Sequence, residues 1–291
     1  MSSSSSSFAN QKVAVVTGSS SGIGYYASLA LARNGFLTYA TMRNLKKADK
    51  LLESAASREG KGEGLQIRTA QLDVTDDKSV NKAIQGILSD AGRIDVLVNN
   101  AGYGLTGAFE DIEMDEIKAL YETNVFGLMR VSQAVLPAMR KQETGGTIIN
   151  ISSGAGRFGY PGGSAYVSTK FAVEGLTESM AFELEQFRIK AVLIEPGFVK
   201  TSFAANAAFA KKAQDSRSPY APMMQKMAPS IGRMMENGSS PELVADAIVE
   251  AATSKSPRLR YIVGKDLEQW MAGRKSMSDE EFSAMIKHGL S

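Results

Sequence analysis

A tyrosine and a lysine four residues apart, Tyr166 and Lys170, are the side chains of this chain best suited to move a proton. On a helix, residues at this spacing lie one turn apart on the same face. An isolated tyrosine has a pKa of about 10 and supplies almost no phenolate at neutral pH. A cation within about 4–6 Å lowers such a pKa by roughly 1–3 units. We therefore expect Lys170 to lower the pKa of Tyr166 until the phenol can act as an acid and a base near neutral pH.

A serine upstream could act together with Tyr166 and Lys170. Ser153 follows the apolar run Thr147–Ile151, which predicts a buried strand. A hydroxyl group at the end of that strand could hold a carbonyl oxygen while Tyr166 protonates it. Tyr166 and Lys170 alone would also fit an ordinary amphipathic helix whose lysine extends its charge to solvent. The choice between the two depends on the rest of the chain.

A glycine-rich turn near the N-terminus has the form of a phosphate-binding site. The run Val13–Val16 predicts a short buried strand, which leads directly into Thr17–Gly24 and then into a helical pattern. Glycines let the backbone approach a pyrophosphate, and the helix N-terminus offers free N–H groups and the positive end of its dipole. The spacing Gly-x-x-x-Gly-x-Gly departs from the Gly-x-Gly-x-x-Gly fingerprint of dinucleotide-binding folds. The turn alone is therefore a moderate signal.

Further motifs follow in an order and at spacings that are typical of one enzyme family. They are Asn99-Asn100-Ala101-Gly102, Asn124, Ser153, Tyr166, Lys170 and Pro196-Gly197. Together with the glycine turn they resemble the short-chain dehydrogenase/reductases. The resemblance is strong from Lys12 to Thr201 and weak in the remainder. One glycine motif would be poor evidence, whereas an ordered set of this size is specific.

The resemblance implies an α/β fold, with a Rossmann-type doubly wound parallel sheet of about seven strands in a single domain. Apolar runs that alternate with helical patterns agree with this fold. Strands are expected at Val13–Val16, Leu37–Met42, Leu65–Leu72, Val96–Asn99, Thr147–Ile151, Ala191–Glu195 and Leu259–Val263. Helices are expected near Ile23–Arg33, Leu45–Arg58, Lys78–Asp90, Asp115–Lys141, Ala165–Phe187 and Pro241–Thr253. Pro137 should kink or end the fourth of these helices.

We expect residues 11–291 to form this one domain, behind a disordered serine-rich leader at residues 1–10. Residues 196–240 interrupt the alternation, because they hold no predicted strand and many methionine and aromatic residues. Ligands in open α/β sheets bind beyond the carboxyl ends of the strands, and methionine adapts to bulky apolar partners. This span is therefore expected to be a helical lid over the substrate. The alternative is that it packs two short helices onto the body of the protein.

The resemblance implies a catalytic role for Asn124, Ser153, Tyr166 and Lys170. In the family, hydride passes between a nicotinamide cofactor and a carbonyl or alcohol carbon. Ser153 and Tyr166 would hold the oxygen, and Tyr166 would exchange its proton. Lys170 would lower the pKa of Tyr166 and bind the nicotinamide ribose, while Asn124 would help to hold a water near the lysine.

The same resemblance places further residues against the cofactor. Asp73 and Val74 would contact the adenine, and Thr201 would bind the nicotinamide carboxamide. The whole expected set is Gly18, Ser20, Ser21, Gly22, Ile23, Gly24, Arg43, Asp73, Val74, Asn100, Ala101, Gly102, Tyr166, Lys170, Pro196, Gly197, Val199 and Thr201. Asp73 has a second interpretation, because Asp73 and Asp76 both precede a predicted helix and could cap it.

The end of the second strand predicts which nicotinamide cofactor binds. An acidic residue there bonds the adenine-ribose hydroxyls and repels a 2′-phosphate. This chain instead has Met42 where NAD-using relatives carry aspartate, followed by Arg43. Arg43 could bind the extra phosphate through charge-assisted hydrogen bonds worth about 1.5–3 kcal/mol. We therefore expect NADP(H), although the cations from Arg43 to Lys47 would also suit an ordinary solvated helix start.

The composition excludes several other classes of protein. The chain has 291 residues, a formal charge of +2 and no cysteine, so nothing indicates nucleic-acid binding, and disulfides and thiolate metal sites are excluded. No run approaches the roughly 18 apolar residues of a membrane span, and the N-terminus lacks the features of a secretory signal. We expect a cytoplasmic protein that needs no metal, binds no nucleic acid and does not span a membrane.

Three stretches resemble the branch of the family that contains 17β-hydroxysteroid and retinol dehydrogenases: Tyr39–Leu45, Ile194–Thr201 and the tail from Pro257. This likeness implies a hydrophobic ketone, aldehyde or secondary alcohol as the small-molecule substrate. The helices Asp115–Lys141 and Ala165–Phe187 resemble those through which family members pair. A homodimer or homotetramer is therefore expected, with these apolar residues exposed on the two helices: Val125, Leu128, Val131, Phe171 and Leu176.

Two other functions compete with this one. The segment Gly18–Gly22 also matches Gly-x-Ser-x-Gly, the nucleophile elbow of serine hydrolases, and it too follows a strand and precedes a helix. That chemistry needs a histidine base, and the only histidine of the chain is His288, close to the C-terminus. A non-enzymatic NADP-binding sensor would keep the fold and lose catalytic residues, whereas all four catalytic residues named above are present.

Overall fold

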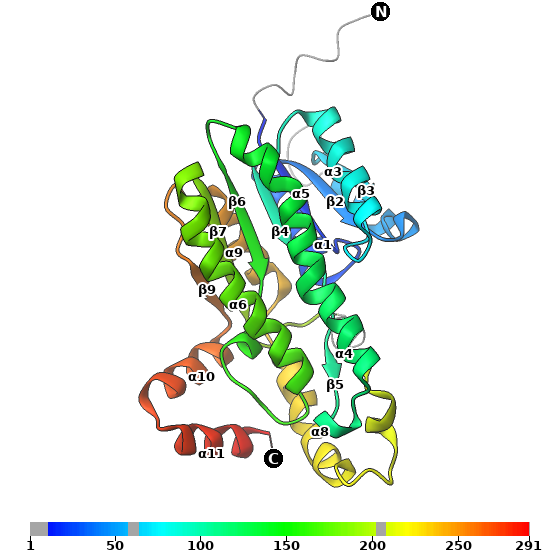
Figure 1. Cartoon of the computed structure of the whole chain (residues 1–291), viewed down its shortest axis with the longest axis vertical. Coiled ribbons are helices and arrows are strands. Elements are labelled where there is room, and N and C mark those ends of the chain that lie inside the picture. Colours follow the sequence, from blue (N-terminus) through cyan, green and yellow to red (C-terminus); the bar gives the residue numbers. More distant parts are fainter. Residues whose placement is uncertain (1–10, 58–63, 202–207, 291) are drawn as a thin grey trace, which may run out of the picture.

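The computed structural model describes residues 11–57, 64–201 and 208–290, and a parallel sheet of seven strands forms its centre (Figure 1). The strands lie in the order β3-β2-β1-β4-β6-β7-β9. They are β1 (Val13–Val16), β2 (Leu37–Met42), β3 (Ile67–Gln71), β4 (Val96–Asn99), β6 (Gly146–Ile151), β7 (Ile189–Pro196) and β9 (Arg260–Val263). Each confirms a predicted strand, with ends that differ by at most two residues.

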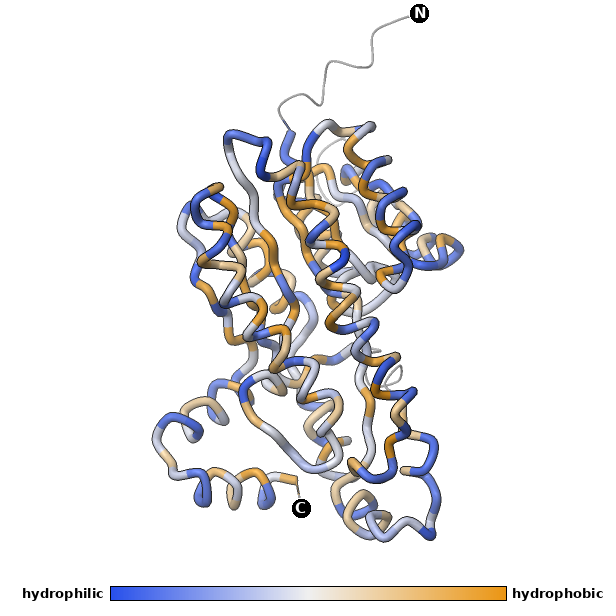
Figure 2. Tube along the Cα trace, in the orientation of Figure 1, coloured by the Kyte–Doolittle hydropathy of each residue, from blue (hydrophilic) through white to orange (hydrophobic). Residues whose placement is uncertain are grey.

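Helices cover both faces of this sheet (Figure 1). One face packs against α3 (Asp77–Ala91), α5 (Gly127–Lys141) and α6 (Ser164–Leu184). The other packs against α1 (Gly22–Arg33) and α9 (Pro241–Thr253). Because both faces are covered, every residue of β1, β2 and β4 is buried, and Figure 2 shows these central strands as largely hydrophobic. The doubly wound α/β fold is confirmed.

Local signals set the ends of α3 where the sequence indicated them. Asp76 caps this helix, because its Oδ1 accepts hydrogen bonds from the N–H groups of Lys78 and Ser79 at 2.8 and 3.3 Å. Gly92 ends it with a φ of 75°, a left-handed conformation that glycine adopts without strain. A cap of this kind contributes about 1 kcal/mol. Of the two aspartates that precede α3, Asp76 is therefore the cap.

The predicted helix Asp115–Lys141 is continuous but not uniform. α4 (Met114–Tyr121) passes through a π-helical turn, Glu122–Phe126, into α5. Pro137 was predicted to kink or to end the helix. It lies inside α5, so it does not end it. Proline removes one hydrogen bond of the helical ladder. The packing of α5 on the sheet, where three of its side chains have no exposed surface, outweighs that loss.

Most of the apolar residues that were expected on the outside of the long helices belong to the core. Val125, Leu128 and Val131 are at most 6% exposed, and Leu176 is half-buried against the core. Only Phe171 of that set is exposed, at 47%. The prediction is wrong for Val125, Leu128 and Val131, because a helix that packs on a sheet buries a wide apolar stripe that sequence spacing does not distinguish from an interface.

A second, two-stranded sheet lies beyond the carboxyl end of the main one. β8 (Ala208–Phe209) pairs in parallel with β5 (Leu105–Thr106). The expectation that residues 196–240 contain no strand is therefore wrong. A strand of two residues has no periodicity that a sequence pattern could reveal. Residues 202–207 of the expected lid lie outside the described part of the chain, as do residues 1–10 of the expected leader.

The helices α8 (Ala221–Glu236), α10 (Lys265–Ser276) and α11 (Asp279–Gly289) lie below the sheet in Figure 1. They share an apolar cluster in which Met227 of α8 and Phe282 of α11 are each 5% exposed. Part of the methionine-rich span thus packs against the C-terminal helices. None of the described helices is long and apolar enough to cross a membrane.

Candidate active site

The strand order reverses direction between β1 and β4, the point at which open α/β folds form a crevice beyond the carboxyl ends of their strands. The chain leaves β1 toward β2 on one side and leaves β4 toward β6 on the other, and ligands of open α/β sheets bind at such a point. The Thr17 hydroxyl accepts hydrogen bonds from the N–H groups of Asn100 and Ala101, both at 3.0 Å. The Asn100 amide donates to the carbonyls of Thr17 and Gly18 at 2.9 and 3.2 Å. The two loops are therefore held together as one unit.

The glycines of this turn are required by backbone conformation and by space. Gly18 and Gly22 have φ values of 69° and 57°, which favour glycine. At Gly24 a Cβ would lie 2.5 Å from the Asn100 amide nitrogen and 2.6 Å from the Gly18 carbonyl oxygen. Ser21 precedes α1 in an extended conformation, and its side chain does not cap the helix. The first N–H groups of α1 can thus meet an anion, and the turn fits the pyrophosphate of a dinucleotide.

The segment after β7 returns to this turn. It carries four of the predicted cofactor residues: Pro196, Gly197, Val199 and Thr201. A Cβ at Gly22 would lie 3.6 Å from the Cβ of Thr201, so the threonine lies against the glycine turn. Asp266 of α10 accepts a hydrogen bond from the Phe198 N–H at 2.8 Å, and its carboxylate fills the space beside Gly197. Sequence reasoning missed Asp266 because it is distant along the chain and belongs to no motif.

Asp73 and Val74 follow β3 at the same edge of the sheet. Asp73 Oδ1 accepts hydrogen bonds from the N–H and the hydroxyl of Thr75 at 3.0 and 2.8 Å, so Asp73 orders the loop. Asp76, not Asp73, caps α3. Val74 is 6% exposed and packs against Gly127 at the start of α5. Both residues lie on the β2 side of the crevice, where the resemblance placed the adenine.

Met42 and Arg43 have opposite surroundings. Met42 is 2% exposed and packs with Tyr25 and Leu51. Arg43 is exposed directly after β2, and its carbonyl oxygen accepts a hydrogen bond from the Gln71 amide at 3.1 Å. The exposed guanidinium group can therefore meet an anion, whereas the apolar surroundings of Met42 would offer no partner to a carboxylate.

Ser153, Tyr166 and Lys170 come together between the end of β6 and the first turns of α6. Ser153 accepts a hydrogen bond from the Ala155 N–H at 3.2 Å, which fixes its side chain. The Tyr166 phenol forms a side-chain hydrogen bond with Ser153. The Lys170 ammonium lies 5.7 Å from the centre of the Tyr166 ring and donates to the Ile151 carbonyl at 2.8 Å. Tyr166 and Lys170 are both buried.

Burial dominates the electrostatics of this pair. It raises the pKa of Tyr166 above its usual value, the Tyr160 phenol adds to the rise, and the Ser153 hydrogen bond opposes it. Burial also lowers the pKa of Lys170 to about 8, against the effect of the Glu174 carboxylate. The expected net lowering of the Tyr166 pKa is therefore not found in this structure, because burial outweighs the effects that oppose it. Neither charged form is well solvated, and Tyr166 is a protonated phenol at neutral pH.

Asn124 fastens the loop after β4 to α6. It lies in the π-helical turn, a local widening that often occurs at functional sites. Its side-chain oxygen accepts a hydrogen bond from the Tyr103 N–H at 3.0 Å, and its amide donates to the Tyr103 carbonyl at 2.9 Å. The amide also lies 3.3 Å from the Thr169 hydroxyl. Gly102 adjoins this amide, since a Cβ there would lie 3.1 Å from the Asn124 oxygen.

A family model described as short chain dehydrogenase matches residues 12–212. The chain belongs to this family. YusZ of Bacillus subtilis, called an uncharacterized oxidoreductase, is 38% identical over 284 residues, which are 97% of this chain and 99% of the relative. A short-chain dehydrogenase from Streptomyces avermitilis has a crystal structure with a TM-score of 0.79 at 32% identity, and the match covers 97% of this chain and 99% of that one.

Other relatives place this short-chain dehydrogenase in the expected branch. Retinol dehydrogenase 8 of Bos taurus is 36% identical over 263 residues, which are 86% of this chain and 80% of the relative. Human 17-beta-hydroxysteroid dehydrogenase type 1 is 36% identical over 255 residues, which are 86% of this chain and 76% of the relative. The structure of ElxO with NADP bound has a TM-score of 0.70 at 29% identity, and the match covers 87% of this chain and 97% of that one. The chain is an oxidoreductase with a fold that binds a nicotinamide cofactor.

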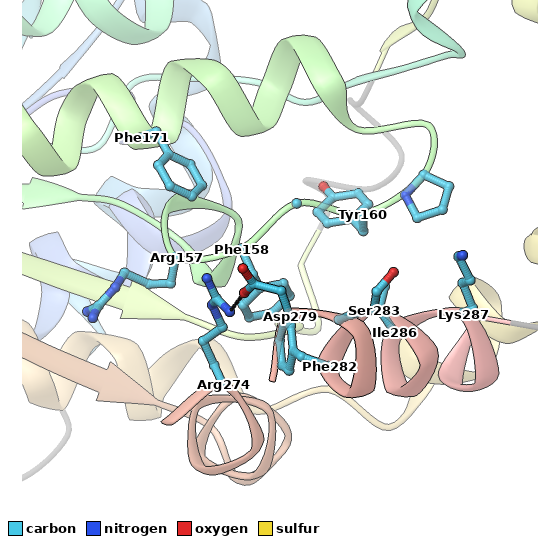
Figure 3. Close-up of a pocket in the computed structure, with 12 residues that line it drawn as sticks. Arg157, Phe158, Tyr160, Phe171, Arg274, Asp279, Phe282, Ser283, Ile286 and Lys287 are labelled. Atoms are coloured by element: carbon cyan, nitrogen blue, oxygen red, sulfur yellow. Dashed lines mark hydrogen bonds and ion pairs between the residues drawn. The ribbon is translucent and has the colours of Figure 1, made fainter. Parts of the chain in front are cut away.

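A tyrosine that the sequence did not single out lies beside the candidate site. Tyr160 contributes to the raised pKa of Tyr166, and burial raises its own pKa to about 12. Its ring fills the space beside Gly163, just before α6. Figure 3 shows this ring between α6 and α11, at the edge of a pocket of about 420 Å³. Tyr160 lies in a loop without periodicity, so no sequence signal distinguished it.

The hydrolase alternative lacks its base. A nucleophilic Ser20 would need a histidine within hydrogen-bond reach. His288 is exposed near the end of α11, which Figure 1 shows at the lower end of the molecule, away from α1 and the glycine turn. The match to Gly-x-Ser-x-Gly therefore reflects the glycine turn and carries no hydrolase chemistry.

Proposed function

We propose that this short-chain dehydrogenase transfers hydride between NADP(H) and a hydrophobic carbonyl compound or its alcohol, with Tyr166 as the acid and base. The observation that supports this most strongly is the meeting of Ser153, Tyr166 and Lys170 at the end of β6. The Asn124 contacts and the loop after β4 connect this group to the glycine turn. The proposed site for proton transfer would thus adjoin the proposed site for a pyrophosphate.

The proposed mechanism follows from the donors around the substrate oxygen. The carbonyl oxygen would accept hydrogen bonds from Ser153 and Tyr166. Negative charge develops on it as hydride, which the nicotinamide supplies when bound, reaches the carbon, and donors aimed at developing charge stabilise the transition state most. The Tyr166 O–H bond breaks and its proton passes to the oxygen, a step worth about 10²–10⁴-fold. In the reverse direction the Tyr166 oxygen accepts the proton.

The raised pKa of Tyr166 favours reduction as the working direction, because the phenol is protonated at neutral pH. Once its proton has left, the Lys170 ammonium would stabilise the phenolate. With a pKa of about 8, Lys170 is mostly charged at neutral pH. It would also hold the ribose hydroxyls of the nicotinamide half. Ser153 keeps one acceptor occupied by Ala155 and can still donate its proton.

The surroundings of Tyr166 favour a hydrophobic substrate. Tyr166 packs in a cluster whose other buried members are Leu105, Ile112, Leu120, Ala155, Ala165 and Ala210. Met224 of α8 lies against Gly162, in the loop that leads to Tyr166. Its sulfur is 3.1 Å from the position that a Cβ of residue 162 would occupy. The names of the retinol and hydroxysteroid relatives agree with such a substrate. We infer that residues 196–240, including α8, cover the substrate. We also infer that residues 11–291 form a single domain, to which this cover belongs.

The variant Tyr166→Phe tests the proposed chemistry. With a panel of ketones and aldehydes and NADPH, turnover should fall about 10²-fold or more, because the only proton donor is lost. NADPH binding, followed by fluorescence titration, should stay unchanged. Tyr121→Phe, which removes a phenol from α4, is the matched control. Parent-like turnover in Tyr166→Phe would remove Tyr166 from the mechanism. A non-enzymatic NADP-binding sensor would instead bind NADPH and reduce no member of the panel.

The variant Arg43→Leu tests the proposed preference for NADP(H). The exposed guanidinium and the absence of a carboxylate at Met42 support this preference. Removing the charge should reduce the ratio of kcat/KM for NADPH over NADH by about ten- to a hundredfold, equivalent to roughly 1.5–3 kcal/mol. Lys46→Leu, which removes a neighbouring exposed cation, should change the ratio little. If the parent protein already prefers NADH, Arg43 does not have the proposed role.

A further inference from the structure

The helix α10 contacts both the segment after β7 and the loop after β6, and it has no part in the mechanism described above. It follows β9 directly (Figure 1). Gly264 forms the turn between them with a φ of 113°, a conformation that residues other than glycine rarely adopt. Two neighbouring residues of α10, Asp266 and Leu267, then meet the two segments. The helix thus connects candidate cofactor residues with candidate catalytic residues.

Asp266 holds the backbone of the segment after β7. Its Oδ2 accepts a hydrogen bond from the Phe198 N–H at 2.8 Å. A Cβ at Gly197 would overlap both carboxylate oxygens, and a Cβ at Gly264 would lie 2.5 Å from Oδ1. The carboxylate thus fills the space between two glycines, and its charge strengthens the hydrogen bond that it accepts.

Ser239, just before α9, holds the next residues of the same segment. Its N–H donates to the Phe198 carbonyl at 2.8 Å, and its carbonyl accepts a hydrogen bond from the Lys200 N–H at 2.9 Å. Thr201 follows directly and lies against the glycine turn. Of these three hydrogen bonds to the segment, only that of Asp266 comes from a side chain. Asp266 is therefore the contact that a substitution can remove.

Leu267 packs against the short turn that fixes Ser153. It is 3% exposed, and its Cδ1 lies 2.6 Å from the position that a Cβ of Gly154 would occupy. Gly154 begins the 3₁₀ turn Gly154–Gly156, in which the Ala155 N–H donates to the Ser153 hydroxyl oxygen at 3.2 Å. Close packing transmits small displacements. A shift of the Leu267 side chain would therefore move the N–H group that orients Ser153.

An aromatic contact extends this support along the loop after β6. Trp270 lies three residues after Leu267, on the same side of α10. Its ring stacks on Phe158, with the ring centres 5.3 Å apart. Phe282 of α11 meets Phe158 edge-on at 5.5 Å, and Figure 3 shows these two rings beside each other. The packing of α10 on this loop fixes its first turn, from which Asp266 and Leu267 reach the site.

We propose that Asp266 and Leu267 are positioning residues, one for the cofactor and one for the substrate oxygen. The inference rests on the proposed function. Asp266 holds the backbone that leads to Thr201, the residue expected to bind the nicotinamide carboxamide. Leu267 holds the turn that keeps the Ser153 hydroxyl in place for the substrate oxygen. Because the two neighbours act on different ligands, their variants should have different kinetic effects.

The variant Asp266→Ala tests the first contact. The Phe198 N–H loses its acceptor, so NADPH affinity, measured by fluorescence titration, should fall about tenfold. Hydrogen exchange in the peptide that covers residues 197–201, followed by mass spectrometry without cofactor, should become faster. With saturating NADPH, kcat for carbonyl reduction should change by about threefold or less.

Asp266→Asn is the conservative variant, because its side-chain oxygen can accept the same hydrogen bond. It should restore NADPH affinity and hydrogen exchange toward the parent values. Glu268→Ala is the matched control, since Glu268 is an exposed carboxylate on the same helix. It should leave both measurements at the parent values.

The variant Leu267→Ala tests the second contact. It removes the methyl group that touches Gly154, and kcat should fall about tenfold, less than the roughly 10²–10³-fold loss that follows removal of an oxyanion donor. NADPH affinity should stay near that of the parent. Gly154→Ala alone should also lower kcat, because its Cβ would meet Leu267. In the Leu267→Ala background the same change fills the vacated space and should recover part of kcat.

Ile286→Ala controls for a general loss of packing among the C-terminal helices. Ile286 is 4% exposed in the apolar cluster that α8, α10 and α11 share. Its truncation should lower the unfolding temperature and, in the folded protein, leave NADPH affinity and kcat near the parent values. A loss of stability alone would therefore not reproduce either expected pattern.

Parent-like NADPH affinity and hydrogen exchange in Asp266→Ala would overturn the role of Asp266. Parent-like kcat in Leu267→Ala, or an equal loss of kcat and NADPH affinity, would overturn that of Leu267. If Asp266→Ala does not fold, Asp266→Glu, which displaces the carboxylate by one methylene group, replaces it with the same expected results. Leu267→Val replaces Leu267→Ala in the same way.

A failure of the proposed function is a different outcome. The parent protein would then reduce no carbonyl, or Tyr166→Phe would reduce carbonyls as fast as the parent. Neither result depends on α10.

Discussion

Lys170 is held as a cation in a place where burial disfavours its charge. Its pKa is about 8 in the folded protein, against the usual value of 10.5 for an exposed lysine. Between these values the unfolded chain binds more protons than the folded one, so the free energy of unfolding rises with pH across this window. Below pH 8 the penalty is present in full. The site thus keeps a destabilising charge, which the proposed chemistry would need.

This penalty predicts a variant that is more stable and inactive. Lys170→Met should raise the free energy of unfolding at pH 7 by roughly 1–3 kcal/mol, because removing the buried charge outweighs the lost bond to the Ile151 carbonyl and the lost attraction to the Glu174 carboxylate. The gain should be smaller at pH 9.5, where the folded protein has already lost the proton. Denaturant unfolding at both pH values measures it. Lys82→Met on the exposed face of α3 should change little, and a destabilised Lys170→Met would show that the hydrogen bond outweighs the charge.

Among the elements, the glycine turn and the loop after β4 act as one unit. Thr17 and Asn100 join them through backbone and side-chain hydrogen bonds. The π-helical turn extends this unit to α6 through Asn124 and Thr169. A change in the turn should therefore affect the proposed cofactor site and the proposed catalytic residues together.

Gly24→Ala tests this coupling. A Cβ there would lie 2.5 Å from the Asn100 amide and 2.6 Å from the Gly18 carbonyl, so the two loops must separate. We expect NADPH affinity to fall at least tenfold and the protein to lose about 1–3 kcal/mol of stability. Gly86→Ala in α3 is the control, because nothing lies within 4 Å of its Cβ position. Alanine there should stabilise the helix by up to about 1 kcal/mol. Unchanged NADPH affinity in Gly24→Ala would show that the turn does not hold the cofactor.

The whole molecule leaves aromatic side chains on the surface of α6. Phe171 and Phe182 are 47% and 76% exposed, and their spacing of eleven residues places them on one face of the helix. Phe126, just before α5, is also 47% exposed. Exposed apolar groups of this kind mark contact surfaces. The expectation of an oligomer first rested on valines and leucines that are mostly buried. These exposed phenylalanines now support it instead.

We predict a homodimer or homotetramer that uses this face of α6. The double variant Phe171→Glu with Phe182→Glu should lower the mass measured by light scattering at micromolar concentration, because the charges oppose burial of the face. Phe109→Glu, a change at a residue that is 71% exposed outside α6, is the control. A parent protein that is strictly monomeric at these concentrations would contradict the prediction, as would an unchanged mass in the double variant.

The sequence by itself determined the seven main strands, and it named most of the residues that the fold brings together at the candidate site. Continuous apolar runs mark strands that are covered on both faces, and glycines mark places where φ or space admits no side chain. Both are local requirements that the chain must meet at fixed positions, as Gly18 and Gly24 do. The spacing of Tyr166 and Lys170 is local as well, since one turn of helix sets it.

Only the tertiary structure decided the electrostatics of these residues and the groups that surround them. The direction of the Tyr166 pKa depends on burial and on Tyr160, which no spacing reveals. Asp266 reaches the segment after β7 from a helix far along the chain. Glu195 and Arg260 meet because β7 and β9 pair. Burial and long-range charge contacts arise from the sum of all elements around a residue, and a local pattern does not contain that information.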